Sequence, residues 1–538
     1  MKKLLLLFLL VSISISHAQQ DALVYFTDKE NVEAAIANPI TILTQEAINR
    51  KQLHNTTIDE RDVPVNETYI SQIKNTSGIS VHAKSKWMNA IYVRGTQTNI
   101  DNLTNLSFVE SVEYMDKSLN FSTPVTTTTN KFDFYDTQER IIYNYGDATN
   151  QVEMLAVDYL HEQDFAGDGM IIAVMDSGFP NVTTNPAFAA INGEGRLLGT
   201  YDFAERQNNV DGTGSHGART YSDIAGLLDG DFVGTAPLAS FYLFRTEFAP
   251  TENPVEEAWW VEALERADSL GVDVVNTSLG YQDYDNPNYD HSYEDLDGQT
   301  TIGARGANHA FDKGMLLVTS AGNDGGGFTF VGTPGDSPGM LTVGAVDNDG
   351  NYASFSSIGP TVDGRIKPDV MAKGLSAAVV DEDGFVTTSS GTSFSSPIMA
   401  GAIASLWESR QEATNAQIMQ IVRESSHLFE NPTDQMGYGI PNFQKAYNNL
   451  QILGVEEVAL KNNFALFPNP IDTFVNVSFP KHENQAIFTI HNVIGKKIID
   501  TKVSRNDNQV DTSNLTSGVY IATVKTETST NSFKLIKR

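Results

Sequence analysis

One serine of this chain lies in a setting suited to nucleophilic chemistry. Ser393 belongs to the run G-T-S-F-S-S-P, residues 391–397, in which a glycine and small residues predict a turn from a strand into a helix. A serine hydroxyl attacks a carbonyl carbon effectively only when a base takes its proton. The simpler interpretation of such a run is a Ser/Thr helix cap. A base elsewhere in the chain would favour catalysis.

A histidine and an aspartate in matching settings precede this serine. The apolar run 170–175 predicts a buried parallel strand and places Asp176 at its carboxyl end, where open α/β sheets have their sites. His216 lies in the glycine-rich segment 212–217, ahead of small residues that predict a buried helix. An imidazole is a suitable base near neutral pH, and a carboxylate fixes its tautomer.

These segments resemble the active-site motifs of the subtilisin family of serine proteases. The D-S-G at 176–178, the H-G at 216–217 and the G-T-S-x-S-x-P run occur in the family's chain order. The run S-A-G-N at 320–323 is similar to a fourth family motif. The resemblance implies that the Asn323 side-chain amide donates to the oxyanion beside the Ser393 backbone N–H. A bare N-D-G turn would mean only chain reversal.

The resemblance implies peptide-bond hydrolysis through an acyl-enzyme, without a catalytic cofactor. The sequence differs from the family pattern at one position: the residue after H-G is usually threonine in the family and is Ala218 here. An alternative is a catalytically silent subtilisin-like scaffold retained as a surface adhesin, but it has no chemical need for four intact catalytic positions. An esterase would normally show a G-x-S-x-G elbow, and none surrounds Ser393.

Two further segments resemble the substrate-binding parts of the family. The strand pattern at 272–280 is similar to V-x-N-x-S-L-G, an edge that accepts an extended peptide. The backbones of Ser278, Leu279 and Gly280 are therefore expected to contact substrate. Gly332 lies in a segment similar to the family's pocket floor. A glycine there implies a deep pocket that accepts large uncharged P1 side chains.

The elements around these motifs alternate between strand and helix signals. Residues 145–450 therefore predict an α/β domain, a parallel sheet flanked by helices. Helices are expected at 255–270 and 304–312. Thr414 and Gln417 form a capping box that predicts a helix through residue 425.

A signal peptide and a further domain are expected in front of the catalytic region. Residues 1–18 have a basic start, a short apolar core and a small residue at a cleavage position. Residues 19–130 show a β-α-β order that resembles an inhibitory α+β propeptide, ending in a Ser/Thr/Pro-rich linker at 122–129. Autocatalytic cleavage is expected between 119 and 151. An unrelated α+β accessory domain is the alternative.

Short alternating strands replace the helix patterns near residue 454 and predict a small β-sandwich at 464–538. The P-N-P run at 468–470, the turn at 492–496, an L-x-x-G-x-Y element at 515–520 and a basic end resemble the C-terminal sorting domain of type IX secretion substrates. The resemblance implies recognition by that machinery, and a secreted or surface-attached enzyme. A plain β-sandwich binding module is the alternative.

The amino-acid composition limits the kinds of partner and cofactor that the chain can bind. A net charge of −31 argues against nucleic acid, since phosphates would be repelled. The chain has no cysteine, which excludes disulfides and thiol catalysis. No segment after the signal peptide has transmembrane length. The acidic segment 281–298 is a candidate for structural calcium, although its spacing does not match an EF-hand and its ligands cannot be identified.

Overall fold

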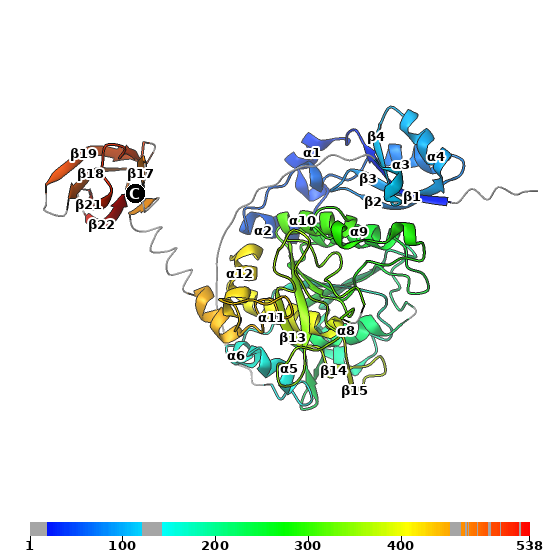
Figure 1. Cartoon of the computed structure of the whole chain (residues 1–538). Helices are drawn as coiled ribbons and strands as arrows, with labels where there is room; N and C mark the ends of the chain where they lie inside the picture. Colours follow the sequence, from blue (N-terminus) through cyan, green and yellow to red (C-terminus); the bar gives the residue numbers. More distant parts are fainter. Residues whose placement is uncertain are drawn as a thin grey trace, which may run out of the picture. The chain divides into compact units, whose positions relative to one another are not determined.

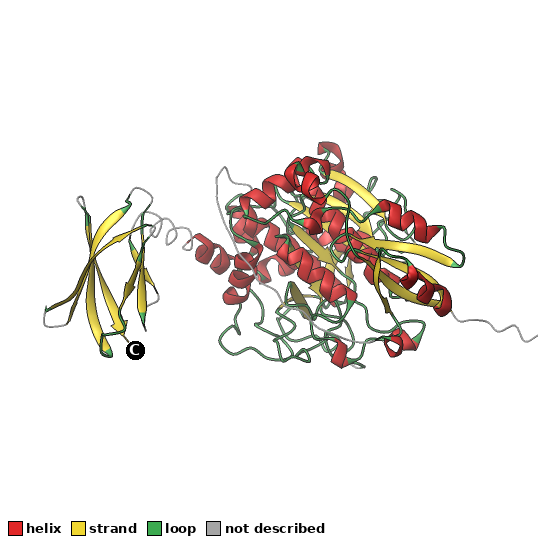
Figure 2. Ribbon diagram, turned by 90° about the horizontal axis from the view of Figure 1, so that it is seen from above, coloured by secondary structure: helices red, strands yellow, loops and turns green. Residues whose placement is uncertain are grey.

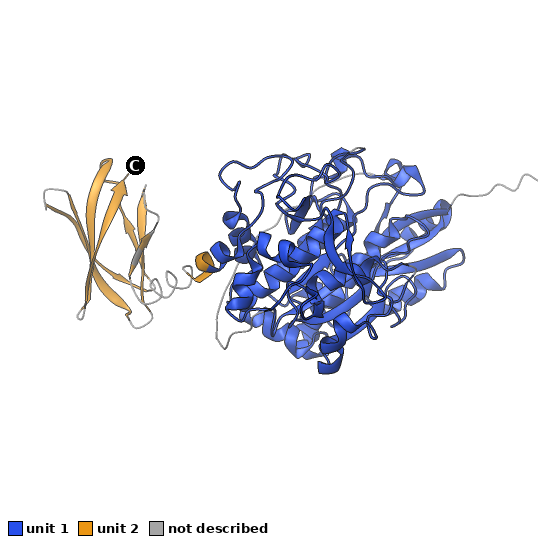
Figure 3. Cartoon of the chain, turned by 90° about the horizontal axis from the view of Figure 1, so that it is seen from below, with its two compact units in different colours: residues 1–447 blue, residues 448–538 orange. Residues whose placement is uncertain are grey.

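The computed structural model describes residues 19–120, 143–451 and 464–537, apart from 213, 326, 468–470, 472, 481–482, 493–495, 506 and 527–528. The predicted signal peptide, the linker at 122–129, the P-N-P run and the centre of the turn at 492–496 lie outside these residues. The chain divides into two compact units, residues 1–447 and 448–538, coloured separately in Figure 3. Each unit is described by itself.

A seven-stranded parallel sheet forms the centre of the first unit, in the order β13-β12-β11-β10-β5-β9-β6. Its strands are β5 (Ile171–Asp176), β6 (Leu197–Asp202), β9 (Ser240–Arg245), β10 (Val274–Thr277), β11 (Leu316–Ser320), β12 (Met340–Val346) and β13 (Val370–Lys373). β10 to β13 are almost continuously apolar and buried, because helices cover both faces of the sheet. The expected α/β sheet is thereby confirmed.

Helices α9 and α10 lie toward the N-terminal domain, and α8 and α11 lie toward the opposite face (Figure 1). The longer helices are α8 (His216–Ala225), α9 (Val255–Leu270), α10 (Ile302–Asp312), α11 (Thr392–Glu408) and α12 (Asn415–Ser425). Short elements complete the domain: α5 (Thr149–Met154), α6 (Val157–Glu162), α7 (Ala189–Glu194), β7 (Leu227–Leu228), β8 (Phe232–Val233), β14 (Ala377–Val380) and β15 (Val386–Ser389). The predicted capping box of Thr414 and Gln417 starts α12.

The N-terminal domain is α+β, as expected. Its antiparallel sheet has the order β2-β3-β1-β4 and carries four short helices. These elements are β1 (Gln19–Phe26), α1 (Val32–Ala37), α2 (Gln45–Leu53), α3 (Glu67–Lys74), β2 (Ile79–Ser85), β3 (Ala90–Thr96), α4 (Gln97–Asp101) and β4 (Val109–Tyr114). One face of the sheet packs on its own helices, and the other packs on α9 and α10 (Figure 1).

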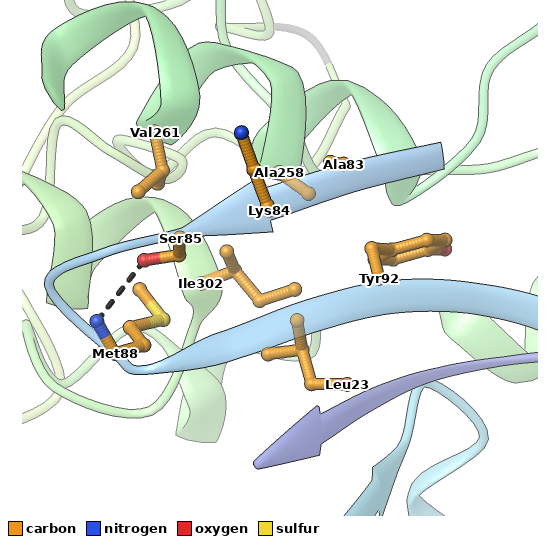
Figure 4. Close-up of a pocket in the computed structure, with 9 residues that line it drawn as sticks. All are labelled: Leu23, Ala83, Lys84, Ser85, Met88, Tyr92, Ala258, Val261 and Ile302. Carbon is orange, nitrogen blue, oxygen red and sulfur yellow. Dashed lines mark hydrogen bonds between the residues drawn. The ribbon is translucent and has the colours of Figure 1, made fainter. Parts of the chain in front are cut away.

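Close-packed side chains and hydrogen bonds join this sheet to α9. Leu23 and Tyr92 share a core with Ala258 and Ile302, which leaves only a small gap between the two layers (Figure 4). At one end of the gap, Glu265 of α9 accepts hydrogen bonds from the β2–β3 turn. Its carboxylate binds Ser85 Oγ at 2.6 Å, Lys86 N at 2.8 Å and Trp87 N at 3.0 Å. The N-terminal domain is therefore firmly seated on helices that cover the parallel sheet.

The second unit is a small β-sandwich of two antiparallel sheets, as expected (Figure 2). One sheet has the order β16-β17-β20 and the other has the order β19-β18-β21-β22. The strands are β16 (Ala465–Phe467), β17 (Phe474–Ser478), β18 (Gln485–Asn492), β19 (Lys497–Ser504), β20 (Gln509–Asp511), β21 (Gly518–Lys525) and β22 (Thr530–Lys537). In the L-x-x-G-x-Y element, Leu515 and Tyr520 are both buried in the core between the sheets.

Candidate active site

Asp176 and His216 form a close pair at the carboxyl edge of the parallel sheet. Asp176 is the last residue of β5 and is fully buried, and His216 is the first residue of α8. Their Oδ1 and Nδ1 atoms are 2.8 Å apart. Gly217 allows this approach, because a Cβ there would come within 2.4 Å of the Gly178 carbonyl oxygen. The His216 side chain remains about one third exposed.

Four hydrogen bonds, one of them from His216, hold the Asp176 carboxylate. Ser177 donates to Oδ1 from N at 2.7 Å and from Oγ at 3.3 Å, and Thr220 Oγ1 lies 3.0 Å from Oδ2. Arg245 is also buried there; it donates to the Ser177 carbonyl and pairs with Asp202 at 2.7 Å. Asp176 raises the pKa of His216 above its usual value, chiefly by charge attraction, although burial of the ring opposes this effect.

Ser393 is the second residue of the 17-residue helix α11 and is nearly buried. Its Oγ donates to the Ser278 carbonyl at 3.4 Å, and within the described residues no hydrogen bond joins it to His216. The two residues are nevertheless neighbours, since the rings of His216 and Phe394 lie 5.8 Å apart. Hydrogen bonds of this kind are often long in free enzymes and tighten when substrate binds.

Asn323 lies beside the start of α11, and its side-chain oxygen Oδ1 accepts hydrogen bonds from Thr392. Thr392 N donates to Asn323 Oδ1 at 2.9 Å, and Thr392 Oγ1 lies 3.1 Å from the same oxygen. This arrangement leaves the Nδ2 amide as the donor end of the side chain. The N–H groups of the first helical turn, that of Ser393 included, also lack partners within the helix. The structure therefore places Asn323 beside the first turn of α11, which contains Ser393.

The predicted substrate-binding residues also lie close to one another. Ser278, Leu279 and Gly280 follow β10, and Ser278 Oγ donates to the Ser393 carbonyl at 2.8 Å. Tyr281 N then donates to the Thr333 carbonyl at 2.8 Å, and the two residues form an isolated antiparallel bridge. Gly332 therefore lies across from the end of this edge, and a Cβ there would be 3.6 Å from the Tyr281 carbonyl.

Several supporting residues escaped the sequence analysis. Thr220 is four residues after His216, and that helical spacing places both on one face, so periodicity could have indicated it. Thr392 lies inside the quoted serine motif, but nothing in the sequence shows that it would hold Asn323. Behind Ser393, Ser396 Oγ donates to Asn276 Oδ1 at 2.7 Å and ties α11 to β10. The buried Ala218 carries no hydroxyl, and the hydroxyl beside Asp176 comes from Thr220.

The acidic segment 281–298 binds protein groups rather than forming a ready metal site. Asp295 pairs with Lys117 of the N-terminal domain at 2.7 Å. Asp290 accepts from Tyr284 N, and Asp297 accepts from two backbone N–H groups that follow it. Across the described part of the chain, no cluster of three or more His, Asp or Glu side chains could hold a metal ion. Calcium binding by this segment stays a prediction.

Three family profiles match parts of this chain. A profile described as the subtilase family matches residues 167–444, just over half of the chain. A second profile, the peptidase S8 propeptide domain of Bacteroidota, matches residues 21–131. A third, the secretion system C-terminal sorting domain, matches residues 465–538. In the described ranges, no helix has the length and apolar character needed to cross a membrane.

Individual proteins match this chain at low identity. Subtilisin NAT of Bacillus subtilis subsp. natto is 28% identical over 318 residues, which cover 58% of this chain and 74% of that protein. The membrane-bound transcription factor site-1 protease of Rattus norvegicus is 26% identical over 332 residues, or 60% of this chain and 28% of that protein.

A solved structure of MycP3 protease from the type VII (ESX-3) secretion system has 21% identity and a TM-score of 0.45, covering 57% of this chain and 90% of its own. The profile match over residues 167–444 and the parallel sheet that carries the matched motifs lead to one conclusion: this chain belongs to the subtilase family, as a serine endopeptidase with a propeptide domain before it and a type IX secretion sorting domain after it.

Proposed function

We propose that this chain hydrolyses peptide bonds through an Asp176-His216-Ser393 triad and an acyl-enzyme intermediate. The observation that carries the proposal is the 2.8 Å bond between Asp176 and His216 at the carboxyl edge of the sheet, with Ser393 at the adjoining start of α11. Asp176 fixes the ring with its proton on Nδ1, which leaves Nε2 free to act as the base.

Each step of the reaction has a group to carry it. Ser393 Oγ attacks the peptide carbonyl carbon while His216 Nε2 takes its proton. His216 returns that proton to the leaving amine as the C–N bond breaks, and the acyl-enzyme forms. Water then repeats the sequence, giving its proton to His216 and its oxygen to the acyl carbon, and Ser393 is released as the free hydroxyl. The charged ring that forms each time is stabilised by Asp176.

Negative charge on the carbonyl oxygen needs donors that are already in place. Asn323 Nδ2 and the backbone N–H of Ser393 supply them in this proposal, and Thr392 keeps the Asn323 amide in the correct orientation. A substrate strand would run along Ser278, Leu279 and Gly280 and make backbone hydrogen bonds there. Its P1 side chain would enter a pocket floored by Gly332, where large uncharged groups are expected to fit. Cleavage confined to sites after Lys or Arg in a peptide library would contradict this preference.

We also propose a role in export or processing for each segment of the chain. Residues 1–18 direct the first membrane crossing, and residues 19–130 form the propeptide and linker. Residues 145–450 form the peptidase, which is freed by cleavage between 119 and 151, and residues 464–538 address the chain to type IX export. The product is secreted or attached to the cell surface, and its substrates are proteins or peptides.

A fluorophosphonate probe tests the catalytic proposal directly. Processed enzyme should take the label at Ser393, as located by peptide mass mapping, and His216→Ala should abolish labelling while the protein remains folded. Ser393→Ala should accumulate uncleaved if maturation is autocatalytic. A folded, propeptide-free enzyme that takes no label would instead support a silent surface scaffold.

A further inference from the structure

The outward face of the sheet β19-β18-β21-β22 is unusually apolar. One face of this sheet packs in the sandwich core, and the other should carry polar side chains. Five aliphatic side chains of the sheet are instead between 36% and 48% exposed: Ile487, Ile498, Val519, Ile521 and Ile536. β-branched residues favour strands, yet that preference does not require them to gather on the solvent side.

Strand register brings most of these side chains together. Val519 of β21 lies directly across from Ile536 of β22, and Ile521 follows two residues later on the same face. Ile521 in turn lies across from His491 of β18, beside the bulge that contains Ile498. We call Ile498, Val519, Ile521 and Ile536 the aliphatic patch. Contiguous exposed apolar groups of this kind mark interaction sites more often than isolated ones do.

Lysines surround the patch. Lys534 lies across from Ile521, and Lys497 lies across from His491. Among the described residues of this face, the one carboxylate is Asp500, and it pairs with Lys497. Residues 464–538 contain nine Lys and Arg against six Asp and Glu, whereas the whole chain has a net charge of −31. The positive charge is therefore concentrated in this domain, which suits a partner with carboxylates.

We propose that the aliphatic patch and its lysines are the surface by which the sorting domain docks on the export machinery, against a protein face with an apolar centre and an acidic rim. The proposal rests on the proposed role of residues 464–538 in export. A protein partner fits better than a lipid surface, because the described residues of this face include none of the aromatic side chains that usually enter a membrane interface. A flat sheet of short aliphatic groups instead matches another flat protein surface.

Export of the full-length chain from a bacterium with a type IX system tests the proposal. The double variant Val519→Thr/Ile521→Thr keeps β-branched residues on the strand and removes the apolar contact. We expect delivery to the medium and cell surface to fall about tenfold, as when central anchors of an interface are lost. Lys534→Glu should have the same effect through charge. Ile487→Thr, on the same face but outside the patch, is the matched control and should export normally.

Three measurements separate the possible outcomes. Thermal unfolding of the purified variants must match the wild type, so that a loss of export reports docking rather than folding. If a chain truncated before residue 464 is exported as well as the wild type, the sorting role itself fails. If truncation blocks export but Val519→Thr/Ile521→Thr and Lys534→Glu are exported normally, the sorting role stands and the docking role of the aliphatic patch is overturned. Binding of the wild type to phosphatidylglycerol vesicles, lost in Val519→Thr/Ile521→Thr, would replace the protein partner with a lipid surface.

Discussion

Replacing Thr220 with valine should expose how much the triad depends on the second oxygen of Asp176. Asp176 Oδ1 accepts hydrogen bonds from His216 Nδ1 and Ser177 N. Among the described residues, Thr220 Oγ1 is the one donor to Oδ2. The hydroxyl has a single proton and also lies 3.1 Å from the Gly217 carbonyl, but the charged acceptor is favoured. Valine keeps the shape and leaves Oδ2 facing a methyl group.

The size of the effect follows from burial. Asp176 and Thr220 are both 0% exposed, so water cannot easily replace the lost donor. A hydrogen bond to a charged group contributes about 1.5–3 kcal/mol, and each 1.36 kcal/mol in the barrier changes a rate about tenfold. We therefore expect Thr220→Val to lower kcat about tenfold or more, with little change in KM. The less stabilised carboxylate should also bind the His216 ring more strongly and move the acid limb of kcat/KM to higher pH.

Steady-state hydrolysis of a fluorogenic peptide across pH 5 to 9 measures both quantities. Thr220→Ser keeps the hydroxyl and should restore the rate. Ser222→Ala removes a buried hydroxyl from the same helix, one that bonds Arg219 O and Val380 N instead, and should leave the pH profile unchanged. Wild-type kcat and an unshifted acid limb in Thr220→Val would show that Oδ2 needs no donor.

Other changes have separate expected results. Asn323→Ala should lower kcat about 10²- to 10³-fold with KM nearly constant, and a smaller loss in the same peptide assay would remove Asn323 from the oxyanion site. The raised pKa of His216 places the acid limb of wild-type kcat/KM above about pH 6.5, since the neutral ring is the base and is lost as pH falls; a limb below that value would contradict the Asp176 attraction. Asp268→Asn should weaken inhibition by the propeptide added in trans at least tenfold, whereas unchanged inhibition would show that its buried ion pairs do not hold the domain. If calcium stabilises the segment 281–298, EDTA should lower the Tm of mature enzyme by several degrees, and an unchanged Tm would contradict that prediction.

Elements that depend on local sequence patterns could be predicted from the sequence, whereas contacts between residues far apart in the chain could not. The strand before Asp176 and the capping box of Thr414 and Gln417 depend on local patterns, and the helix at 255–270 was predicted at its observed bounds. The pairing of Thr392 with Asn323 joins residues 69 positions apart, which periodicity cannot reveal. The acidic segment 281–298 was interpreted from composition alone, which cannot show that its charges meet the N-terminal domain.

Buried ion pairs join helix α2 and the turn at residue 62 to the peptidase domain. Arg50 and Lys51 both bind Asp268 of α9, at 2.5 and 2.7 Å, and Lys313 binds Asp62 at 2.7 Å, all almost fully buried.

Buried ion pairs gain little net free energy, because desolvation nearly cancels their attraction, but removal of one partner leaves an expensive unpaired charge. The cluster therefore specifies where the propeptide docks more than how tightly. The ion-pair partners that the structure gives Asp268 and Lys313 all lie in the N-terminal domain, so its departure opens both to water together. An interface of this kind makes misplacement of the domain costly and its separation less costly, which would suit the inhibitory propeptide that residues 19–130 resemble.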